Sequence, residues 1–230
     1  MASPAGDRAI RDVGMDVVAN LERLRNRIAD AGGDVDRIRV IAVTKTHDVD
    51  AVIAARAAGI DDIGENYAQE LVTKSDALGD DQPRWHFIGQ LQRKKVRQVA
   101  HVVHLWQSVD RLRLGDEIAK RVPGARVLVE VNLTDDPARG GQKPAFVPGL
   151  VDGLRDLGLE VRGLMAVGVT GTPDDVRAGF DTVRGLADTL DLEERSMGMS
   201  DDLEIAVAAG STMVRIGTAL FGARSASGLG

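Results

Sequence analysis

Short runs of apolar residues alternate along this chain with longer stretches whose apolar side chains recur every three or four positions. The run Val40 to Val43 is nearly continuous and rich in β-branched residues, which is typical of a strand covered by helices on both faces. Similar runs recur downstream with helical periods between them. We therefore expect eight strands, at residues 39–46, 62–65, 85–89, 102–108, 126–133, 161–167, 196–199 and 213–217.

A helix is predicted before the first strand, and its apolar positions share one face: Val13, Val17, Leu21, Leu24 and Ile28. Eight units of strand and helix in a chain of 230 residues favour the α/β class, as a single closed (β/α)8 TIM barrel with this extra N-terminal helix. We expect the barrel to span residues 13–224. Residues 1–12 and 225–230 are predicted to be disordered.

An open, doubly wound sheet is the alternative architecture. It would normally contain fewer units and a glycine-rich fingerprint beside the first strand. The sequence has no such fingerprint there. The closed barrel is therefore the better prediction.

Composition and charge narrow the possible functions. The net charge of −6 argues against a dedicated nucleic-acid binder, and the absence of cysteine excludes disulfides, thiolate nucleophiles and cysteine-ligated metals. No apolar stretch is long enough to span a membrane, and the four histidines are not spaced as metal ligands. We expect a cytoplasmic protein with no metal site and no nucleic-acid or membrane partner.

Lys45 is the first candidate for chemistry, because it lies at the carboxyl end of the first predicted strand. In parallel α/β folds the carboxyl ends of the strands hold the active site, since the loops that leave them converge there. The alternative is a solvent-exposed lysine at the end of a strand, with no functional role. The segments around the seventh and eighth strands favour the functional interpretation.

Ser200 lies where the seventh strand gives way to a helix. A serine hydroxyl and free main-chain N–H groups at such a junction can bind an oxyanion. The alternative is a simple helix cap, in which Asp201 and Glu204 stand at the spacing of a capping box.

The eighth strand leads into a second potential phosphate site, made of Gly217 and Thr218. Glycine permits close approach of the backbone to a ligand, threonine offers a hydroxyl, and a helix N-terminus presents unpaired N–H groups. Barrels commonly bind phosphate after their seventh and eighth strands. Arg215, two residues earlier, is predicted to project into the barrel mouth, because a strand interior rarely buries an unpartnered guanidinium.

A lysine, a phosphate site and an inward arginine together suit a ligand with an aldehyde, a phosphate and a ring nitrogen. Pyridoxal 5'-phosphate (PLP) has all three groups. A neutral lysine amine can form a Schiff base with the aldehyde, and an arginine can only donate to the pyridine nitrogen. Such an arginine keeps that nitrogen unprotonated, which makes the ring a weak electron sink.

Motifs from five parts of the chain resemble the YggS/PROSC family of pyridoxal phosphate homeostasis proteins: 41–46, Gly64-Glu65-Asn66-Tyr67, 85–92, 196–202 and 215–222. The resemblance implies an alanine racemase N-terminal-type barrel, of fold type III among PLP proteins. It implies Lys45 as the Schiff-base lysine, Asn66 near the cofactor, Ser200, Gly217 and Thr218 at the phosphate, and Arg215 at the ring nitrogen. It also implies control of intracellular PLP supply, with no established catalytic residue or reaction.

Three functions remain open at this point. A protein that holds PLP as a lysine aldimine and delivers it to apo enzymes needs only these groups, and we expect a monomer or weak homodimer. An amino-acid racemase needs a second acid–base group opposite Lys45, and Tyr67 is the chain's single tyrosine. A Schiff-base aldolase would make no specific use of Arg215.

Four other features have simpler interpretations. We expect His86 to be a hydrogen-bonded residue inside the barrel, Asn132 to line the mouth, and residues 134–142 to form an exposed loop or lid. The basic run at Arg93, Lys94 and Lys95 is predicted to be a solvated face, or to attract an anionic partner.

Overall fold

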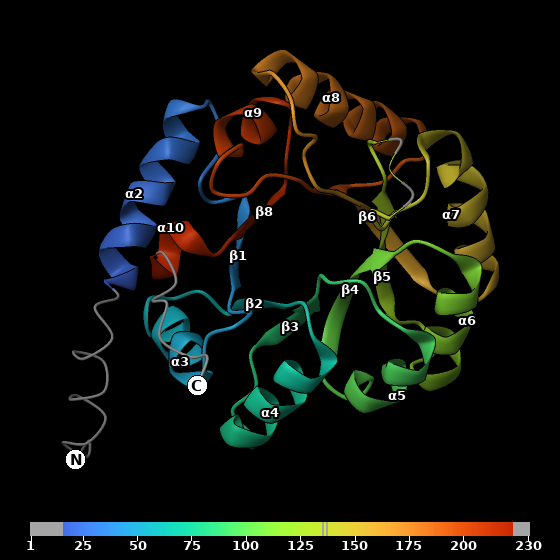
Figure 1. Ribbon diagram of the computed structural model, residues 1–230, viewed down its shortest axis with the longest axis horizontal. Coiled ribbons are helices and arrows are strands. Elements are labelled where there is room, and N and C mark those ends of the chain that lie inside the picture. Colours follow the sequence, from blue (N-terminus) through green and yellow to red (C-terminus); the bar gives the residue numbers. More distant parts are fainter. Residues whose placement is uncertain (1–15, 135, 137, 223–230) are drawn as a thin grey trace.

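Eight parallel strands close into a barrel in the order of the sequence, with helices around the outside (Figure 1). The computed structural model describes residues 16–134, 136 and 138–222. The strands are β1 (Arg39–Val43), β2 (Asp62–Glu65), β3 (Arg84–Phe87), β4 (Val103–Val109), β5 (Arg126–Val131), β6 (Glu160–Ala166), β7 (Glu194–Ser196) and β8 (Met213–Ile216). The predicted (β/α)8 barrel is therefore confirmed.

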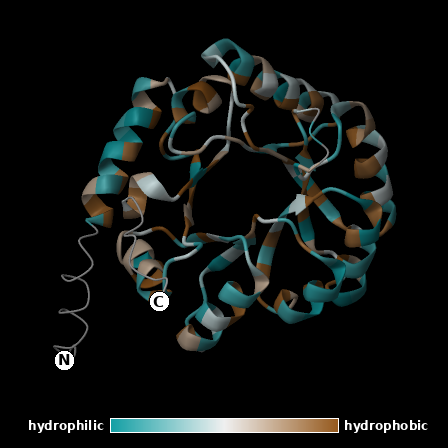
Figure 2. Ribbon diagram, in the orientation of Figure 1, coloured by the Kyte–Doolittle hydropathy of each residue, from teal (hydrophilic) through white to brown (hydrophobic). Residues whose placement is uncertain are grey.

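The outer layer consists of one helix that precedes β1 and of helices that follow the strands, and the ribbon of these helices shows both hydrophobic and hydrophilic segments (Figure 2). They are α2 (Val17–Asp30), α3 (Val49–Ala57), α4 (Ala68–Leu78), α5 (Val96–Val99), α6 (Leu112–Arg121), α7 (Val147–Asp156), α8 (Pro173–Thr189), α9 (Leu203–Ala208) and α10 (Thr218–Phe221), with short 3-10 turns η1 (Arg93–Lys95) and η2 (Pro144–Phe146). Each strand thus returns to the sheet through a crossover that covers its outer face.

The predicted extra N-terminal helix is α2, which lies against α9 and α10 (Figure 1). Asp16 caps it by accepting a hydrogen bond from the Ala19 amide at 2.9 Å. The buried side chains are four of the five predicted: Val17, Leu21, Leu24 and Ile28. Val13 and the terminal segments 1–12 and 225–230 lie outside the described residues.

Two separate hydrophobic clusters hold the layers together. The larger one fills the space between strands and helices. The smaller one is contributed only by strands and packs the barrel interior, with the members Ile41, Leu105, Leu128, Met165 and Met213. The barrel interior is therefore filled by side chains, and this packing holds the carboxyl ends of the strands in fixed positions.

The seventh strand was predicted too late in the sequence. It covers Glu194–Ser196 and not 196–199. Thr212 fixes this register, since its Oγ1 accepts from the Arg195 amide at 2.8 Å and its own amide donates to the Arg195 carbonyl at 2.9 Å. Gly198, with φ +94°, then turns the chain out of the sheet.

Within the described residues, no helix combines the length and apolar character needed to cross a membrane.

Candidate functional site

Lys45 follows β1 by two residues and is exposed at the carboxyl end of the barrel. Its predecessor Thr44 is buried, and the Thr44 hydroxyl donates to Glu65 Oε1 at 2.5 Å. Lys74, on α4, donates from Nζ to the same carboxylate oxygen at 2.5 Å and to the Thr44 carbonyl at 2.7 Å. Burial raises the pKa of Glu65, and the Lys74 ammonium opposes that rise. This buried network fixes the backbone from which Lys45 projects.

Thr46, on the other side of Lys45, is also held by a residue of α4. Its φ of +66° lies in the left-handed region, which is unusual for a β-branched residue. Its amide donates to Glu70 Oε2 at 2.8 Å, and Glu70 is also 3.9 Å from the Lys74 ammonium. Lys45 thus lies between two residues that are each anchored by α4 side chains.

Arg215 is buried on β8, the strand that pairs with β1. Its Nη1 donates to the Ser196 carbonyl at 2.6 Å and to Ser196 Oγ at 2.8 Å, and its Nη2 donates to the Ala166 carbonyl at 2.8 Å. No described carboxylate lies within salt-bridge distance of it, and burial lowers its pKa to about 10. The guanidinium is therefore held by neutral acceptors and oriented without being neutralised.

A chain of buried hydrogen bonds continues from Arg215 across the barrel interior. Ser196 Oγ donates to Gln107 Oε1 at 2.7 Å, so the Gln107 amide nitrogen faces His86 Nδ1, at 2.7 Å. His86 Nδ1 must accept this bond, and Nε2 therefore holds the hydrogen that is donated to Asp62 Oδ1 at 2.8 Å. In every hydrogen bond of this series the donor is on the Arg215 side and the acceptor is on the Asp62 side.

Asp62 terminates this chain at the other end of the barrel. Burial alone would raise the pKa of its carboxyl, but hydrogen bonds from His86 and Arg84 hold it well below its usual value. The prediction that His86 is a hydrogen-bonded barrel residue is confirmed, and its ring is fully buried.

The predicted phosphate residues lie on two successive loops, after β7 and after β8. Ser200 Oγ accepts a hydrogen bond from the Ala219 amide at 3.2 Å, which joins the two loops. Gly217 caps α10, and Thr218 is the first residue of that helix. A Cβ added at Gly217 would come no closer than 3.4 Å to another atom, the Val43 carbonyl oxygen, so the fold itself does not require glycine there.

The predicted capping box does not form at the start of α9. Asp202, and not Asp201, is the N-cap residue, and its side chain makes no capping bond. Instead Asp202 Oδ1 accepts from the Met199 amide at 2.6 Å within the preceding loop, while Glu204 pairs with Arg27 of α2 at 2.6 Å. Of the two carboxylates that the sequence spacing assigned to the cap, Glu204 is therefore taken by a tertiary partner, and Asp201 is not the N-cap residue.

Asn66 directly follows β2, the other neighbour of β1, and lines a cavity of about 310 Å³ at the mouth. Its Oδ1 is buried without a hydrogen-bond partner. Glu130, on the same cavity, also has an unpartnered buried oxygen, and burial, with a contribution from Asp110, raises its pKa to about 7. Gly89 allows the Asn66 backbone to come close, since a Cβ there would lie 2.2 Å from the Asn66 carbonyl oxygen.

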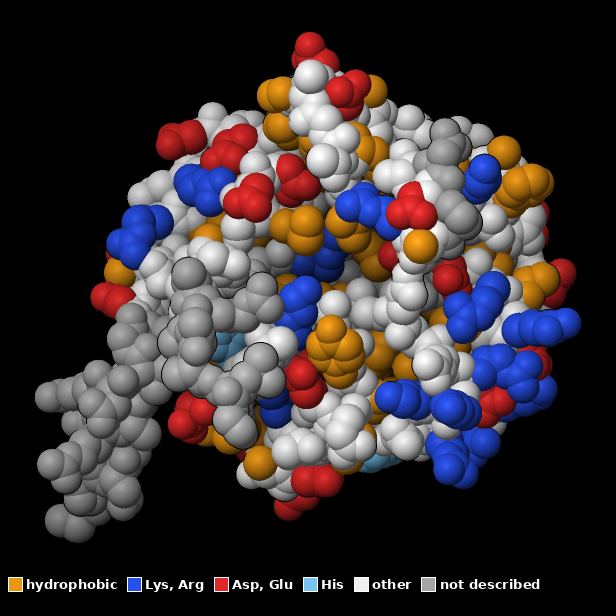
Figure 3. Space-filling view, in the orientation of Figure 1, with side chains coloured by type: hydrophobic (Ala, Val, Ile, Leu, Met, Phe, Trp, Pro, Cys, Tyr) orange, Lys and Arg blue, Asp and Glu red, His pale blue; other side chains and the backbone are white. Residues whose placement is uncertain are grey.

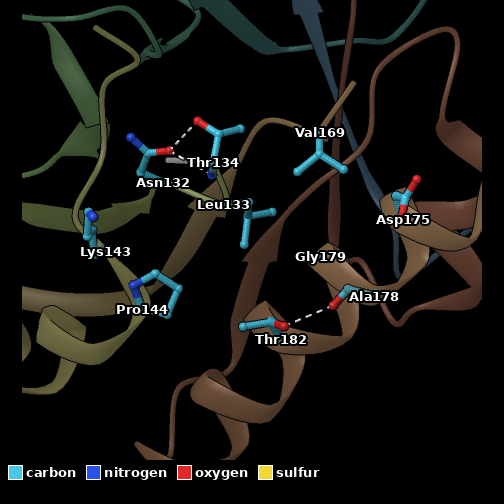
Figure 4. Close-up of a pocket in the computed structure, with 10 residues that line it drawn as sticks. All are labelled: Asn132, Leu133, Thr134, Lys143, Pro144, Val169, Asp175, Ala178, Gly179 and Thr182. Carbon is cyan, nitrogen blue, oxygen red and sulfur yellow. Dashed lines mark hydrogen bonds between the residues drawn. The ribbon is translucent and has the colours of Figure 1, made fainter. Parts of the chain in front are cut away.

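Asn132 lines this cavity, but it also organises the loop that follows β5. Its Nδ2 donates to the carbonyls of Asp136 and Arg139, each at 3.1 Å, and its Oδ1 accepts from the amide and hydroxyl of Thr134, each at 2.9 Å. A second cavity of about 470 Å³ lies between this loop and α8 (Figure 4). It contains none of the six predicted site residues.

The barrel brings the predicted residues to one end of neighbouring strands. Ile41 of β1 is in register with Arg215 of β8, so the chain segments with Lys45 and Gly217 leave the sheet side by side. Basic side chains are visible in the central hollow of this face (Figure 3). The sequence did not reveal the supporting residues Gln107 and Lys74, because isolated polar residues in a strand and a helix give no signal until their partners are known.

Comparison with known proteins gives the family. The sequence profile described as "Alanine racemase, N-terminal domain" matches residues 17–225. The chain is 40% identical to the pyridoxal phosphate homeostasis protein of Pseudomonas aeruginosa, covering 88% of this chain and 91% of that one. It is 38% identical to the protein of the same name from Escherichia coli K12, with coverages of 92% and 98%.

Solved structures agree with this result. PipY of Synechococcus elongatus, with PLP bound, is 33% identical and has a TM-score of 0.77, covering 90% of this chain and 100% of that one. Alanine racemase of Clostridium difficile has a TM-score of 0.71 at 15% identity, which shows a shared fold. The chain therefore belongs to the family of pyridoxal phosphate homeostasis proteins, built on the alanine racemase N-terminal barrel.

Proposed function

We propose that this protein holds PLP at the carboxyl end of its barrel and helps to control PLP supply by passing it to apo enzymes. Lys45 would supply the amine that captures the aldehyde. The observation that carries the proposal is Arg215, a buried guanidinium that only neutral acceptors hold in place. That arrangement suits a ligand with a neutral ring nitrogen.

Arg215 fits the ring end of PLP for a chemical reason. Its guanidinium can only donate hydrogen bonds, so it favours an unprotonated pyridine nitrogen. When bound, PLP supplies an electron sink, and an unprotonated nitrogen weakens that property. The residue thus favours retention of the cofactor over reaction of a bound amino acid.

Asn66 and the two loops fit the remaining groups of PLP. The unpartnered Asn66 Oδ1 can accept a hydrogen bond from a ligand, which would remove the penalty of a buried, unsatisfied acceptor. Ser200, Gly217 and Thr218 offer a hydroxyl, an open backbone and a helix start to a phosphate. The PLP-bound PipY structure, at 33% identity, supports PLP as the ligand.

The main alternative, an amino-acid racemase, finds less support. Racemisation needs two acid–base groups on opposite sides of the reacting carbon. Tyr67 is the chain's single tyrosine, and its side chain is 55% exposed with no hydrogen bond to a described residue. Proton transfer on a chosen face requires a more fixed group than this one.

Transfer to an apo enzyme tests the proposal. Purified protein loaded with PLP is freed of unbound cofactor and mixed with an apo PLP-dependent enzyme, and the recovered activity is followed. We expect recovery in proportion to the PLP supplied. No recovery would contradict delivery, and turnover of a single amino-acid enantiomer, detected by chiral chromatography, would favour the racemase.

A further inference from the structure

Five basic side chains on η1, α5 and α6 make no hydrogen bond or ion pair with any described residue. We call them the basic rim: Arg93, Lys94, Lys95, Arg97 and Arg113. Both η1 and α6 begin on the side where β3 and β4 end, which is the side of the barrel mouth. Figure 3 shows lysine and arginine side chains gathered over α5 and α6 on that face.

The basic rim is one continuous surface. Arg111, at the start of α6, donates from Nη2 to the Leu91 carbonyl at 2.8 Å, and this bond ties α6 to the segment just before η1. Helix α6 also contacts η1 and α5. The five cations are thus held together by the fold and do not depend on the conformation of a mobile loop.

The cluster is unusual for this chain, whose net charge is −6. Many other arginines have carboxylate partners; Arg56, for example, pairs with Asp61 and Asp81. Like charges held together without counter-charges repel one another and destabilise the fold slightly. A surface that keeps them beside the mouth of the barrel is suited to attract an anionic partner.

An exposed apolar residue of α6 borders the basic rim, a second lies on the neighbouring η2–α7 segment, and both point to a protein partner. Leu112, next to Arg113 on α6, is 47% exposed and packs over Gly153 of α7, and α7 is preceded in the chain by Phe146 of η2, which is 63% exposed. Arginine beside large apolar and aromatic side chains is the composition of protein–protein interfaces. A nucleic acid draws its affinity from many phosphate contacts, and the net charge of −6 of this chain opposes such binding.

We propose that the basic rim docks an acidic surface of the recipient apo enzyme, next to the opening through which that enzyme admits its cofactor. This inference rests on the proposed delivery function. Electrostatic attraction would speed the encounter and orient the two openings toward each other. The acidic residues would come from the partner, which explains why this chain leaves its cations unpaired.

The test reverses charge on the rim while keeping a matched control. The rim variant is Arg93→Glu/Arg97→Glu/Arg113→Glu. The control variant is Arg25→Glu/Arg37→Glu/Arg177→Glu, which changes three exposed arginines that also lack described partners and alters net charge equally. The probe is an apo PLP enzyme whose cofactor entrance is ringed by aspartate and glutamate.

The recovery rate is measured against acceptor concentration and salt. For wild type and control we expect a rate that rises with acceptor concentration and falls with salt. For the rim variant we expect a rate roughly tenfold lower at low salt, with little salt dependence. Equal rates for rim variant and wild type, or a rate independent of acceptor concentration, would overturn the docking surface.

A binding measurement separates docking from delivery. Borohydride-reduced protein, which cannot release its cofactor, is titrated into the apo acceptor in a calorimeter. We expect binding by wild type and control and a loss of at least tenfold in affinity for the rim variant. Absence of binding by wild type overturns docking even where transfer succeeds. If transfer fails but binding still depends on the rim, the delivery function is contradicted and the docking surface is supported. Rim-dependent retention of single-stranded RNA at physiological salt would reassign the surface and contradict the proposal.

Discussion

Arg215 donates from a single guanidinium nitrogen to both the carbonyl and the hydroxyl of Ser196, at 2.6 and 2.8 Å. The residue that we propose to contact the cofactor ring is therefore oriented by a serine that has its own hydrogen-bond partner. The Ser196 hydroxyl donates to Gln107 Oε1, and the series of hydrogen bonds ends at Asp62. The position of Arg215 thus depends on residues deep inside the barrel.

Gln107→Leu tests that dependence. The substitution leaves His86 Nδ1 without a donor and the hydrogen of the Ser196 hydroxyl without an acceptor in a dry interior, so we expect a loss of about 2–4 kcal/mol in the free energy of unfolding. PLP affinity should fall as well, because Arg215 loses its fixed support. Urea unfolding and PLP titration measure the two effects. Gln98→Leu, at an exposed position on α5, is the control and should change stability by less than about 0.5 kcal/mol.

Lys74→Met should destabilise the loop that holds Lys45. It removes the partner of a fully buried carboxylate at Glu65, and breaking such a pair costs about 3–5 kcal/mol. Lys120→Met removes an exposed pair with Asp116 and should cost less than about 1 kcal/mol. Thermal unfolding compares the two variants, and equal losses would mean that the buried network does not support the loop.

Glu130 should make stability depend on pH near neutrality. Its pKa rises from 4.5 to about 7 on folding, so the folded protein binds the proton more tightly than the unfolded chain does. This contribution is fully present below the unfolded pKa and is lost as the pH rises from about 4.5 through about 7. Glutamine does not ionise, so Glu130→Gln should remove this pH dependence. Stability at pH 8, where wild type holds a buried charged carboxylate, should rise by up to about 3 kcal/mol relative to wild type. Identical pH profiles of the unfolding free energy would show that Glu130 ionises without penalty.

Gly217→Ala should separate ligand binding from folding. The backbone there has φ −110°, and the added methyl would meet no protein atom closer than 3.4 Å, so stability should change by less than about 0.5 kcal/mol. A phosphate held by the Gly217 backbone would meet the methyl, and we expect at least a tenfold loss of PLP affinity, about 1.4 kcal/mol. Gly149→Ala, at an open position on α7, should leave PLP affinity unchanged. Unchanged affinity in both variants would remove Gly217 from the proposed site.

The barrel was predictable because each buried strand is a compact apolar run that helical periods separate from the next. The proposed site residues were predicted because five of them follow the ends of those runs and Arg215 is a charged residue within the last run. The supporting role of Lys74 was not predicted, because a lysine in a helix is normally solvent-exposed and the sequence does not show that Glu65 faces it. Asn132 was expected simply to line the mouth, and its four hydrogen bonds to the following loop could not be inferred from alternation along a strand.

The most direct measurement of the central claim is the site of covalent attachment. Protein loaded with PLP is reduced with borohydride, digested and analysed by mass spectrometry, beside Lys45→Ala and Lys94→Ala. The account predicts a phosphopyridoxyl group on Lys45 in wild type and Lys94→Ala, and neither this modification nor a visible absorbance band in Lys45→Ala. Stoichiometric modification of another lysine, or a band of wild-type strength in Lys45→Ala, would contradict it.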